Sequence, residues 1–589
     1  MSYDGDGNIV RSIDILGKKE YNYEYEEGKI VRATESDIVL NGEIVTSKVV
    51  VNTVKYYYNA EGRMTKKVIT FSDNSTHTVH YENTDDNTVV KFDVPDTENA
   101  NKKQTITSHN KTDSFGRKIF DELQIGRGFV SRQFSYMPGA ITEAHKESRK
   151  IKSTATTQLV SQIILSDGRT LSYEYDAEER ITKVTDSVDG VTEYTYDALG
   201  QLLTETVNGK LVNSMTYDNY GNILSKNGIT YTYGNNVWKD LLTSFDGQTI
   251  EYDAQGNPTS YLGHTLTWEK GRQLKSFDNI TYTYNANGIR TSKTIGEVKH
   301  TYTLDGTKIL RETWGNNALI PLYDNEDSVC GIIYNDVPYY FIKNLQGDVI
   351  AIVDKDAQTV AKYSYDAWGE CTVTQDSVGI ATANPFRYRG YYYDAEIGMY
   401  YLQSRYYDAN TGRFINMDEA IMISVEHAAL KHNLFTYCGN DVDYSDFSGC
   451  FRVKTWIVST ALDVIFALLN HWMMCGYIAL SGTIWTLART PFTKKLALNI
   501  IQTKVIPIYV RGFYNAALTG LRKVLQNFGR IGKEFAKAFS QDVGVSILTR
   551  ALNSRFLEIV TSLLTWGGII SLFFDMADGS WDGYITILN

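Results

Sequence analysis

Cysteine is scarce in this chain of 589 residues, and the few cysteines are widely separated. Small disulfide-rich scaffolds and zinc ribbons both need dense or closely paired cysteines. No CxxC pair occurs among the five that are present, which are Cys330, Cys371, Cys438, Cys450 and Cys475. The sequence therefore predicts neither a disulfide framework nor a structural zinc site.

The start of the chain and its histidines also lack familiar patterns. The first residues, M-S-Y-D-G-D-G-N, carry no positive cluster and no apolar run, so we expect no cleaved signal peptide. His427 and His432 are five positions apart, which is a poor spacing for two metal ligands on a helix. Residues 451–589 contain a single histidine. We therefore expect no metal and no cofactor.

A short motif recurs along most of the chain: Tyr-Asp, two variable residues, and then Gly with a polar neighbour. Successive copies start 21 residues apart at first and then 35 and 32 apart, and the last copy follows after 81 residues, as in repeat arrays with insertions. The copies, some of them imperfect, are residues 175–180, 196–201, 217–222, 252–257, 284–288 and 365–370. Such an array is a scaffold, so chemistry is expected where the repetition stops.

Each repeat predicts a strand, a tight turn and a second strand. Residues 192–196 and 280–284 alternate Thr with Tyr, Glu or Ile, and this period-two pattern of β-branched and aromatic residues is typical of strands. In the turn, Asp accepts from backbone N–H groups and Gly adopts a positive φ. Single hairpins are marginal in water, so stacked hairpins must pair their edges and bury a common face.

The motifs resemble the YD repeats of the RHS family, which are shared with the C subunits of insecticidal toxin complexes and, more distantly, with teneurins. Residues 405–408 (R-Y-Y-D) and 412–418 (G-R-F-I-N-M-D) are similar to the RHS core terminus, R-Y-Y-D-P-x-x-G-R-F-x-x-x-D-P. Residues 433–440 (N-L-F-T-Y-C-G-N) resemble the family's N-L-Y-x-Y-x-x-N, and 446–450 (D-F-S-G-C) stand where it has D-P-x-G-L. The resemblance covers about residues 1–450.

The resemblance implies a mainly β fold, in which a spiral of strands forms a hollow shell with a plug at one end. We expect the YD-repeat shell over residues 1–404, an RHS core terminus over 405–450, and a separate, mostly α-helical domain over 451–589. The shell is short for a cage that encloses 139 residues on its own, which suggests that part of it is missing.

The resemblance also implies that the core terminus is an aspartyl autoprotease. Asp418 and Asp446 match the paired aspartates of the family, and Arg405 matches its motif arginine. The cut is then expected between Cys450 and Phe451. Two carboxyl groups can share the catalysis of peptide hydrolysis, because one activates water while the other donates a proton. The family prolines are replaced by Glu and Phe, and Cys450 replaces Leu; the alternative is that the two aspartates only cap turns.

Composition changes sharply near residue 450. Residues 451–589 contain 14 Lys or Arg and 7 Asp or Glu, whereas residues 1–450 contain 44 and 62. From 456 to 488, Asp463 is the one clearly charged residue, and a later basic segment, 518–539, places apolar residues on one helical face. Apolar stretches beside a basic amphipathic helix are typical of membrane-active polypeptides. The candidate residues of this membrane-active segment are Trp456, Asp463, His471, Trp485 and Trp566.

Three functions fit these patterns. The leading hypothesis is a polymorphic toxin of bacterial competition, whose shell encloses and releases a pore-forming effector. The second is a surface adhesion protein anchored by its C-terminal segments, and the third is the same shell with a soluble enzymatic toxin. The first predicts a target-cell membrane, an immunity protein and a secretion or delivery machine as partners, with no nucleic acid. It also predicts secretion or delivery from a bacterial cell, with the effector at the target membrane.

Overall fold

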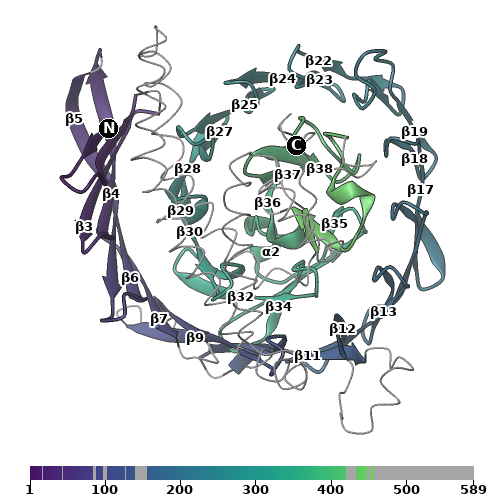
Figure 1. The fold of residues 1–589 in the computed structure, drawn as a ribbon, viewed down its shortest axis with the longest axis horizontal. Coiled ribbons are helices and arrows are strands. Elements are labelled where there is room, and N and C mark those ends of the chain that lie inside the picture. Colours follow the sequence, from purple (N-terminus) through teal and green to yellow (C-terminus); the bar gives the residue numbers. More distant parts are fainter. Residues whose placement is uncertain are drawn as a thin grey trace, which may run out of the picture. The chain divides into compact units, whose positions relative to one another are not determined.

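A computed structural model describes residues 1–418, 433–446 and 452–454, except for positions 16, 43, 84–87, 97–101, 127 and 139–155. The chain divides into two units. The first contains residues 1–111 and 119–455, and the second contains 112–118 and 456–589. In the first unit, successive strands follow one another along a curved wall (Figure 1).

The first sheet runs from β1 to β21, and each strand pairs antiparallel with its neighbour in sequence. Its strands are β1 (Ser2–Tyr3), β2 (Ile9–Asp14), β3 (Lys19–Glu26), β4 (Lys29–Asn41), β5 (Ile44–Tyr58), β6 (Met64–Phe71), β7 (Thr76–Asn83), β8 (Thr88–Pro95), β9 (Lys103–Thr112), β10 (Lys118–Ile125), β11 (Gly128–Pro138), β12 (Thr156–Leu165), β13 (Thr170–Tyr175), β14 (Ile181–Asp186), β15 (Gly190–Tyr196), β16 (Leu202–Val207), β17 (Lys210–Tyr217), β18 (Ile223–Lys226), β19 (Ile229–Thr232), β20 (Ser244–Phe245) and β21 (Gln248–Thr249).

The second sheet continues the same sequential antiparallel pairing. Its strands are β22 (Glu251–Tyr252), β23 (Pro258–Tyr261), β24 (His264–Glu269), β25 (Gln273–Phe277), β26 (Ile280–Tyr284), β27 (Arg290–Ile295), β28 (Val298–Asp305), β29 (Lys308–Trp314), β30 (Asn317–Tyr323), β31 (Val329–Tyr334), β32 (Val337–Lys343), β33 (Val349–Val353), β34 (Thr359–Tyr365) and β35 (Cys371–Asp376).

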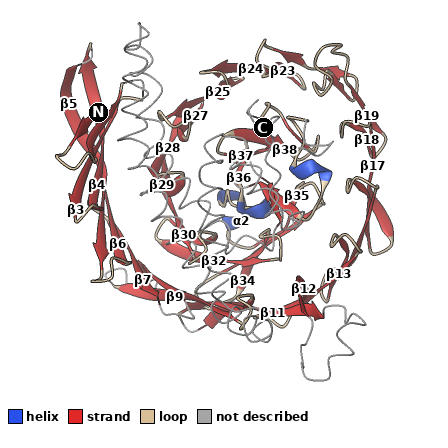
Figure 2. Ribbon diagram, in the orientation of Figure 1, coloured by secondary structure: helices blue, strands red, loops and turns tan. Residues whose placement is uncertain are grey.

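Shorter elements follow the wall. They are the helix α2 (Ile380–Ala383), the 3₁₀ turns η1 (Tyr388–Gly390) and η3 (Cys438–Asn440), a sheet of β36 (Tyr392–Asp394), β37 (Met399–Leu402), β38 (Arg405–Asp408) and β39 (Arg413–Phe414), and the pair β40 (Tyr444–Asp446) and β41 (Arg452–Lys454). Strands dominate the residues that the structure describes (Figure 2). The prediction of a mainly β fold is thus confirmed.

The Tyr-Asp motif builds its turn through the aspartate side chain. Asp197 Oδ1 accepts from the backbone N–H of Leu199 at 2.8 Å and of Gln201 at 2.9 Å, and its Oδ2 accepts from Gln201 Nε2 at 2.7 Å. Gly200 donates its N–H to the Asp197 carbonyl and has a φ of 85°, which a residue with a Cβ adopts only with strain. The predicted turn chemistry is therefore confirmed here.

The motif tyrosine ties each repeat to the preceding one. Its hydroxyl donates to a backbone carbonyl 15 residues earlier in three consecutive repeats: Tyr175 to Val160, Tyr196 to Ile181, and Tyr217 to Leu202. Burial raises the pKa of the Tyr196 hydroxyl well above its usual value, so it remains a donor. The ring covers apolar surface while the hydroxyl satisfies a neighbouring strand, which explains the frequent tyrosine.

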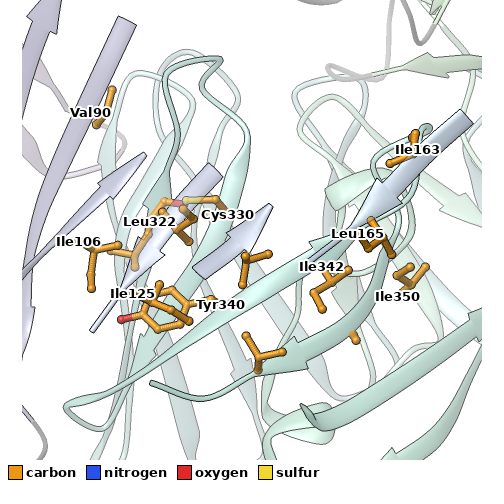
Figure 3. Packing of buried hydrophobic residues seen from close by; sticks show 14 of the residues in the cluster. Val90, Ile106, Ile125, Ile163, Leu165, Leu322, Cys330, Tyr340, Ile342 and Ile350 are labelled. Carbon is orange, nitrogen blue, oxygen red and sulfur yellow. The ribbon is translucent and has the colours of Figure 1, made fainter. Parts of the chain in front are cut away.

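A large apolar cluster joins early and late strands of the unit. Side chains of β8, β9 and β10 pack with those of β30 and β32, as Figure 3 shows for Val90, Ile106, Ile125, Leu322 and Tyr340. These residues are almost completely buried. The later strands therefore lie against the inner face of the earlier wall, a packing that buries apolar surface from both.

The sheet β36–β39 lies inside the curve of the wall (Figure 1). Polar contacts fix it there: Tyr261 donates to Asp408 Oδ2 at 2.7 Å, and Tyr231 donates to the Thr411 carbonyl at 2.9 Å. Buried Met399 and Ile415 pack with apolar residues of the wall strands. Within the described ranges, no helix is long and apolar enough to cross a membrane.

Candidate active site

Arg405 lies between the two aspartates that the sequence analysis selected. Its Nη2 is 3.1 Å from Asp418 Oδ2 and 2.9 Å from Asp446 Oδ2. The three side chains come from β38, the segment after β39, and β40. All are buried: Arg405 is 3%, Asp418 8% and Asp446 2% exposed. The structure thus brings the three predicted residues into one group.

The guanidinium of Arg405 is held on two further sides. Its Nη1 donates to the Leu434 carbonyl at 3.1 Å, and its central carbon lies 3.5 Å from the centroid of the Phe414 ring. A planar guanidinium offers several donors in fixed directions, which lysine does not. This geometry leaves Nη2 directed at both carboxylates.

The Leu434 carbonyl also positions Asp418. The backbone N–H of Asp418 donates to it at 3.0 Å, beside the bond from Arg405. One peptide oxygen therefore holds both the arginine side chain and the backbone of its carboxylate partner. Any movement of Leu434 would change both contacts.

Asp446 is held by a tyrosine. Its backbone N–H donates to the Tyr391 hydroxyl at 2.7 Å, and that hydroxyl lies 3.0 Å from the hydroxyl of Tyr437. Burial raises the pKa of Tyr391 well above its usual value, so the hydroxyl keeps its proton. Asp446 is thus fixed at its backbone by Tyr391 and at its side chain by Arg405.

Asp446 lies opposite a strand that follows it closely in sequence. β40 pairs antiparallel with β41, and the register opposes Asp446 to Arg452. The predicted cut between Cys450 and Phe451 falls in the connection between these strands, which lies outside the described residues. The strand pair keeps both ends of that connection at the site.

The group has the components for acid-catalysed peptide hydrolysis. Two buried carboxylates approach the same nitrogen of Arg405. Peptide hydrolysis by carboxylates uses such a pair when one acid carries a proton and the other is ionised. Within the described ranges, no group of His, Cys, Asp or Glu side chains is arranged to hold a metal ion.

Sequence reasoning missed three residues that support the group: Leu434, Tyr391 and Asp240, whose Oδ2 accepts from the Leu434 N–H at 3.0 Å. Leu434 contributes through its backbone, so its side chain carries no signal. Tyr391 begins a run of tyrosines in a tyrosine-rich chain, and Asp240 lies outside every Tyr-Asp motif. The predicted membrane-active residues lie outside the described residues: Trp456, Asp463, His471, Trp485 and Trp566.

Comparison with known proteins identifies the wall and its terminus. The family model described as "Teneurin YD-shell" matches residues 307–442, a range that includes Arg405 and Asp418. Residues 307–442 are therefore similar to the shells of the RHS/YD-repeat family. The family resemblance seen in the YD motifs is confirmed. The wall of the first unit is therefore called the YD shell.

Curated relatives match only part of the chain. The tRNA3(Ser)-specific nuclease WapA of Bacillus spizizenii is 38% identical over 188 residues, covering 30% of this chain and 8% of the relative. The tRNA(Glu)-specific nuclease WapA of Bacillus subtilis subsp. natto is 35% identical over 211 residues, covering 34% and 9%. The double-stranded DNA deaminase toxin A of Burkholderia cenocepacia is 24% identical over 265 residues, covering 37% and 17%. The chain thus spans less than a fifth of these relatives.

Solved structures support the fold. The crystal structure of TcdB2-TccC3-Cdc42 matches 77% of this chain and 24% of its own, with a TM-score of 0.58 and 16% identity. That of TcdB2-TccC3 without the hypervariable C-terminal region matches 74% and 24%, with a TM-score of 0.55 and 17% identity. At this identity the likeness concerns the YD shell alone.

Proposed function

We propose that the chain is an RHS-type toxin whose core terminus cuts the bond between Cys450 and Phe451 and releases residues 451–589. The observation that carries this proposal is the contact of one Arg405 nitrogen with both Asp418 and Asp446, beside the strand pair that flanks the bond. The domain limits of 404 and 450 belong to the same proposal.

The proposed reaction is hydrolysis. The ionised carboxylate takes a proton from water, whose oxygen attacks the Cys450 carbonyl carbon, while the protonated carboxyl donates to the carbonyl oxygen. Collapse breaks the C–N bond, and the Phe451 nitrogen receives a proton. The products are a carboxylate at Cys450 and an amine at Phe451. Arg405 balances the negative charge of the acids and fixes their positions.

The released part is proposed to act on membranes. Its excess of Lys and Arg and its nearly uncharged stretch from 456 to 488 favour binding to anionic bilayers. Residues 1–450 are acidic, so the YD shell and its passenger carry opposite net charge. Enclosure would keep the apolar stretch from aggregating before delivery. A cognate immunity protein and a bacterial secretion or delivery machine complete this proposal.

A nucleic-acid enzyme is the second candidate, because the curated relatives are named as tRNA nucleases and a DNA deaminase. The nucleic acids in these names differ, although each relative matches about a third of this chain. The matched part therefore fits a common shell, while the target would be set elsewhere. That candidate adds nucleic acid as a partner, which the membrane proposal does not need.

Intact mass of the purified full chain under denaturing conditions tests the cut. The expected result is a fragment that begins at Phe451, and its loss in Asp418→Asn and Asp446→Asn. Asp278→Asn is the matched control, because Asp278 is exposed on the wall far from Arg405 in sequence. An unchanged chain that remains whole, or an Asp446→Asn chain that is still cut, would contradict the proposal.

Bacterial cells producing residues 451–589 separate the two effector activities. Rapid loss of membrane potential with intact tRNA and DNA supports the membrane proposal. Cleaved tRNA or deaminated DNA with an unchanged potential supports the nucleic-acid candidate. Cells producing the full chain with Asp446→Asn serve as the control, since that chain is expected to retain its passenger.

A further inference from the structure

Asp240 connects the wall to the candidate active site. It lies in the loop between β19 and β20, is buried, and accepts the Leu434 N–H at 3.0 Å through Oδ2. Burial raises the pKa of Asp240, although the Leu434 N–H and the nearby Arg413 oppose this shift. The Asp240 carbonyl accepts from Arg413 Nη2 at 2.8 Å. The loop therefore contacts the core terminus through both its side chain and its backbone.

The peptide group of Leu434 transmits this contact. Its N–H donates to Asp240, and its carbonyl accepts from Arg405 Nη1 and from the Asp418 N–H. The wall, the arginine and one aspartate are thus joined through a single residue. Loss of the Asp240 contact frees the segment that orients the other two.

An aromatic clamp surrounds the same segment. The ring of Phe435 lies 6.3 Å from that of Trp238 and 6.4 Å from that of Tyr252, both on the wall. Leu241 packs with Leu434 and Phe435 in one buried cluster. The wall loop therefore packs against residues 434 and 435 by apolar contact, and the hydrogen bond from the Leu434 N–H to Asp240 fixes their position.

A second polar contact lies beside the clamp. Asn433 Nδ2 donates to Asn222 Oδ1 at 2.7 Å, and Asn222 belongs to a Tyr-Asp motif whose Asp218 accepts from Asn222 Nδ2 at 2.8 Å. Two separate turns of the wall thus hold consecutive residues of the core terminus. Both contacts hold residues 433–435 against the wall.

We propose that Asp240 is a positioning residue for self-cleavage, which makes cutting depend on the docking of wall residues 233–243 against residues 433–435. This inference rests on the proposed function. Arg405 and Asp418 reach their positions only after the loop has bound Leu434. The docking of this wall loop would therefore precede the cut at Phe451.

The test compares full-length Asp240→Ala and Asp240→Asn with the unchanged chain. An amide oxygen still accepts the Leu434 N–H, whereas alanine offers no acceptor. Small misplacements of reacting groups cost large factors in rate, so Asp240→Ala is expected to slow cutting roughly 10- to 100-fold. Asp240→Asn is expected to cut within about threefold of the unchanged rate, because it keeps a neutral hydrogen bond. Glu251→Ala, which removes an exposed wall carboxylate, is the matched control.

Hydrogen exchange of the peptide that contains residues 433–437 gives a readout that does not depend on cutting. It is expected to rise in Asp240→Ala but not in Glu251→Ala, with β30–β33 protected in both. Equal rates and equal exchange in Asp240→Ala and the unchanged chain would overturn this inference. So would equal loss of cutting in the alanine and asparagine variants. An unchanged chain that is never cut overturns the proposed function, whereas normal cutting in Asp240→Ala overturns the positioning role alone.

Discussion

Arg290 and Asp394 form a buried ion pair with two hydrogen bonds between the wall and the inner sheet. Nη1 of Arg290 donates to Oδ2 of Asp394 at 2.5 Å, and Nη2 donates to Oδ1 at 3.0 Å. Lys293 adds a third bond to Asp394 Oδ1 at 2.9 Å. The pair joins β27 to β36, so it connects two sheets that the backbone does not pair.

Replacing Asp394 by Asn is expected to destabilise the first unit strongly. The change leaves buried Arg290 without this carboxylate, although Lys293 keeps its contact with Glu396. Breaking a buried ion pair in this way costs about 3–5 kcal/mol. The midpoint of urea unfolding, followed by tryptophan fluorescence, should fall accordingly. Asp278→Asn is the control, because Asp278 pairs with His264 in an exposed position where such pairs contribute about 0–1 kcal/mol. Equal midpoints for the two variants would contradict the expectation.

Glu205 should make stability depend on pH. Its carboxylate accepts from Asn213 Nδ2 and the Ala367 N–H, while burial first and the charge of Asp366 second raise its pKa to about 7. Between its ordinary value of 4.5 and about 7, the folded chain therefore holds a proton that the unfolded chain has lost. Stability from this group falls as pH rises through that range and stays low above it.

Glu205→Gln tests this dependence, because glutamine does not titrate. The free energy of unfolding of the variant relative to the unchanged chain should rise between pH 4.5 and 7, by on the order of 3 kcal/mol. Denaturant unfolding at several pH values measures the difference, in which the other titrating groups cancel. Glu251→Gln, which changes a carboxylate at an exposed wall position, is the matched control. If this difference did not change with pH for Glu205→Gln, the pH dependence could not be assigned to Glu205.

Local features of the fold were predictable from the sequence. The stretch 280–284 is β26, and 192–196 lies within β15, because alternation and turn residues act over a few neighbouring positions. The contact between early and late strands was not predictable. Val90 and Leu322 are far apart in sequence but belong to one buried apolar cluster, and no periodicity in the sequence predicts this packing.

The candidate site was predictable only through the family resemblance. Arg405, Asp418 and Asp446 were selected by their match to the core terminus, and their meeting at one nitrogen is a tertiary contact. Asp240 gave no signal, because a lone aspartate in a loop is typical of turn chemistry. Its role depends on a backbone N–H of Leu434, which every residue except proline carries.

Removing the Tyr391 hydroxyl should weaken self-cleavage. Tyr391→Phe deletes the acceptor for the Asp446 N–H and a partner of Tyr437, at a cost of about 1–3 kcal/mol for buried groups. Asp446 then loses the hydrogen bond that holds its backbone N–H, so the rate of appearance of the fragment beginning at Phe451 should fall. Tyr393→Phe is the matched control, since Tyr393 lies in the same run of tyrosines and its ring packs against Tyr400 and Arg387. Identical rates in both variants would show that the tyrosine does not position Asp446.

Two glycines of the wall separate backbone strain from disruption of the aromatic clamp. Gly256 has a φ of 79° and Gly247 a φ of 76°, so alanine is strained at both by about 1 kcal/mol. A Cβ at Gly256 would lie 2.7 Å from the Trp238 ring, whereas one at Gly247 meets nothing within 4 Å. Gly256→Ala must therefore displace Trp238, which packs against Phe435. Both variants should lose similar backbone stability, but only Gly256→Ala should slow cutting, measured by intact mass over time. Slow cutting in Gly247→Ala as well would mean that general destabilisation of the wall, rather than the clamp, controls the reaction.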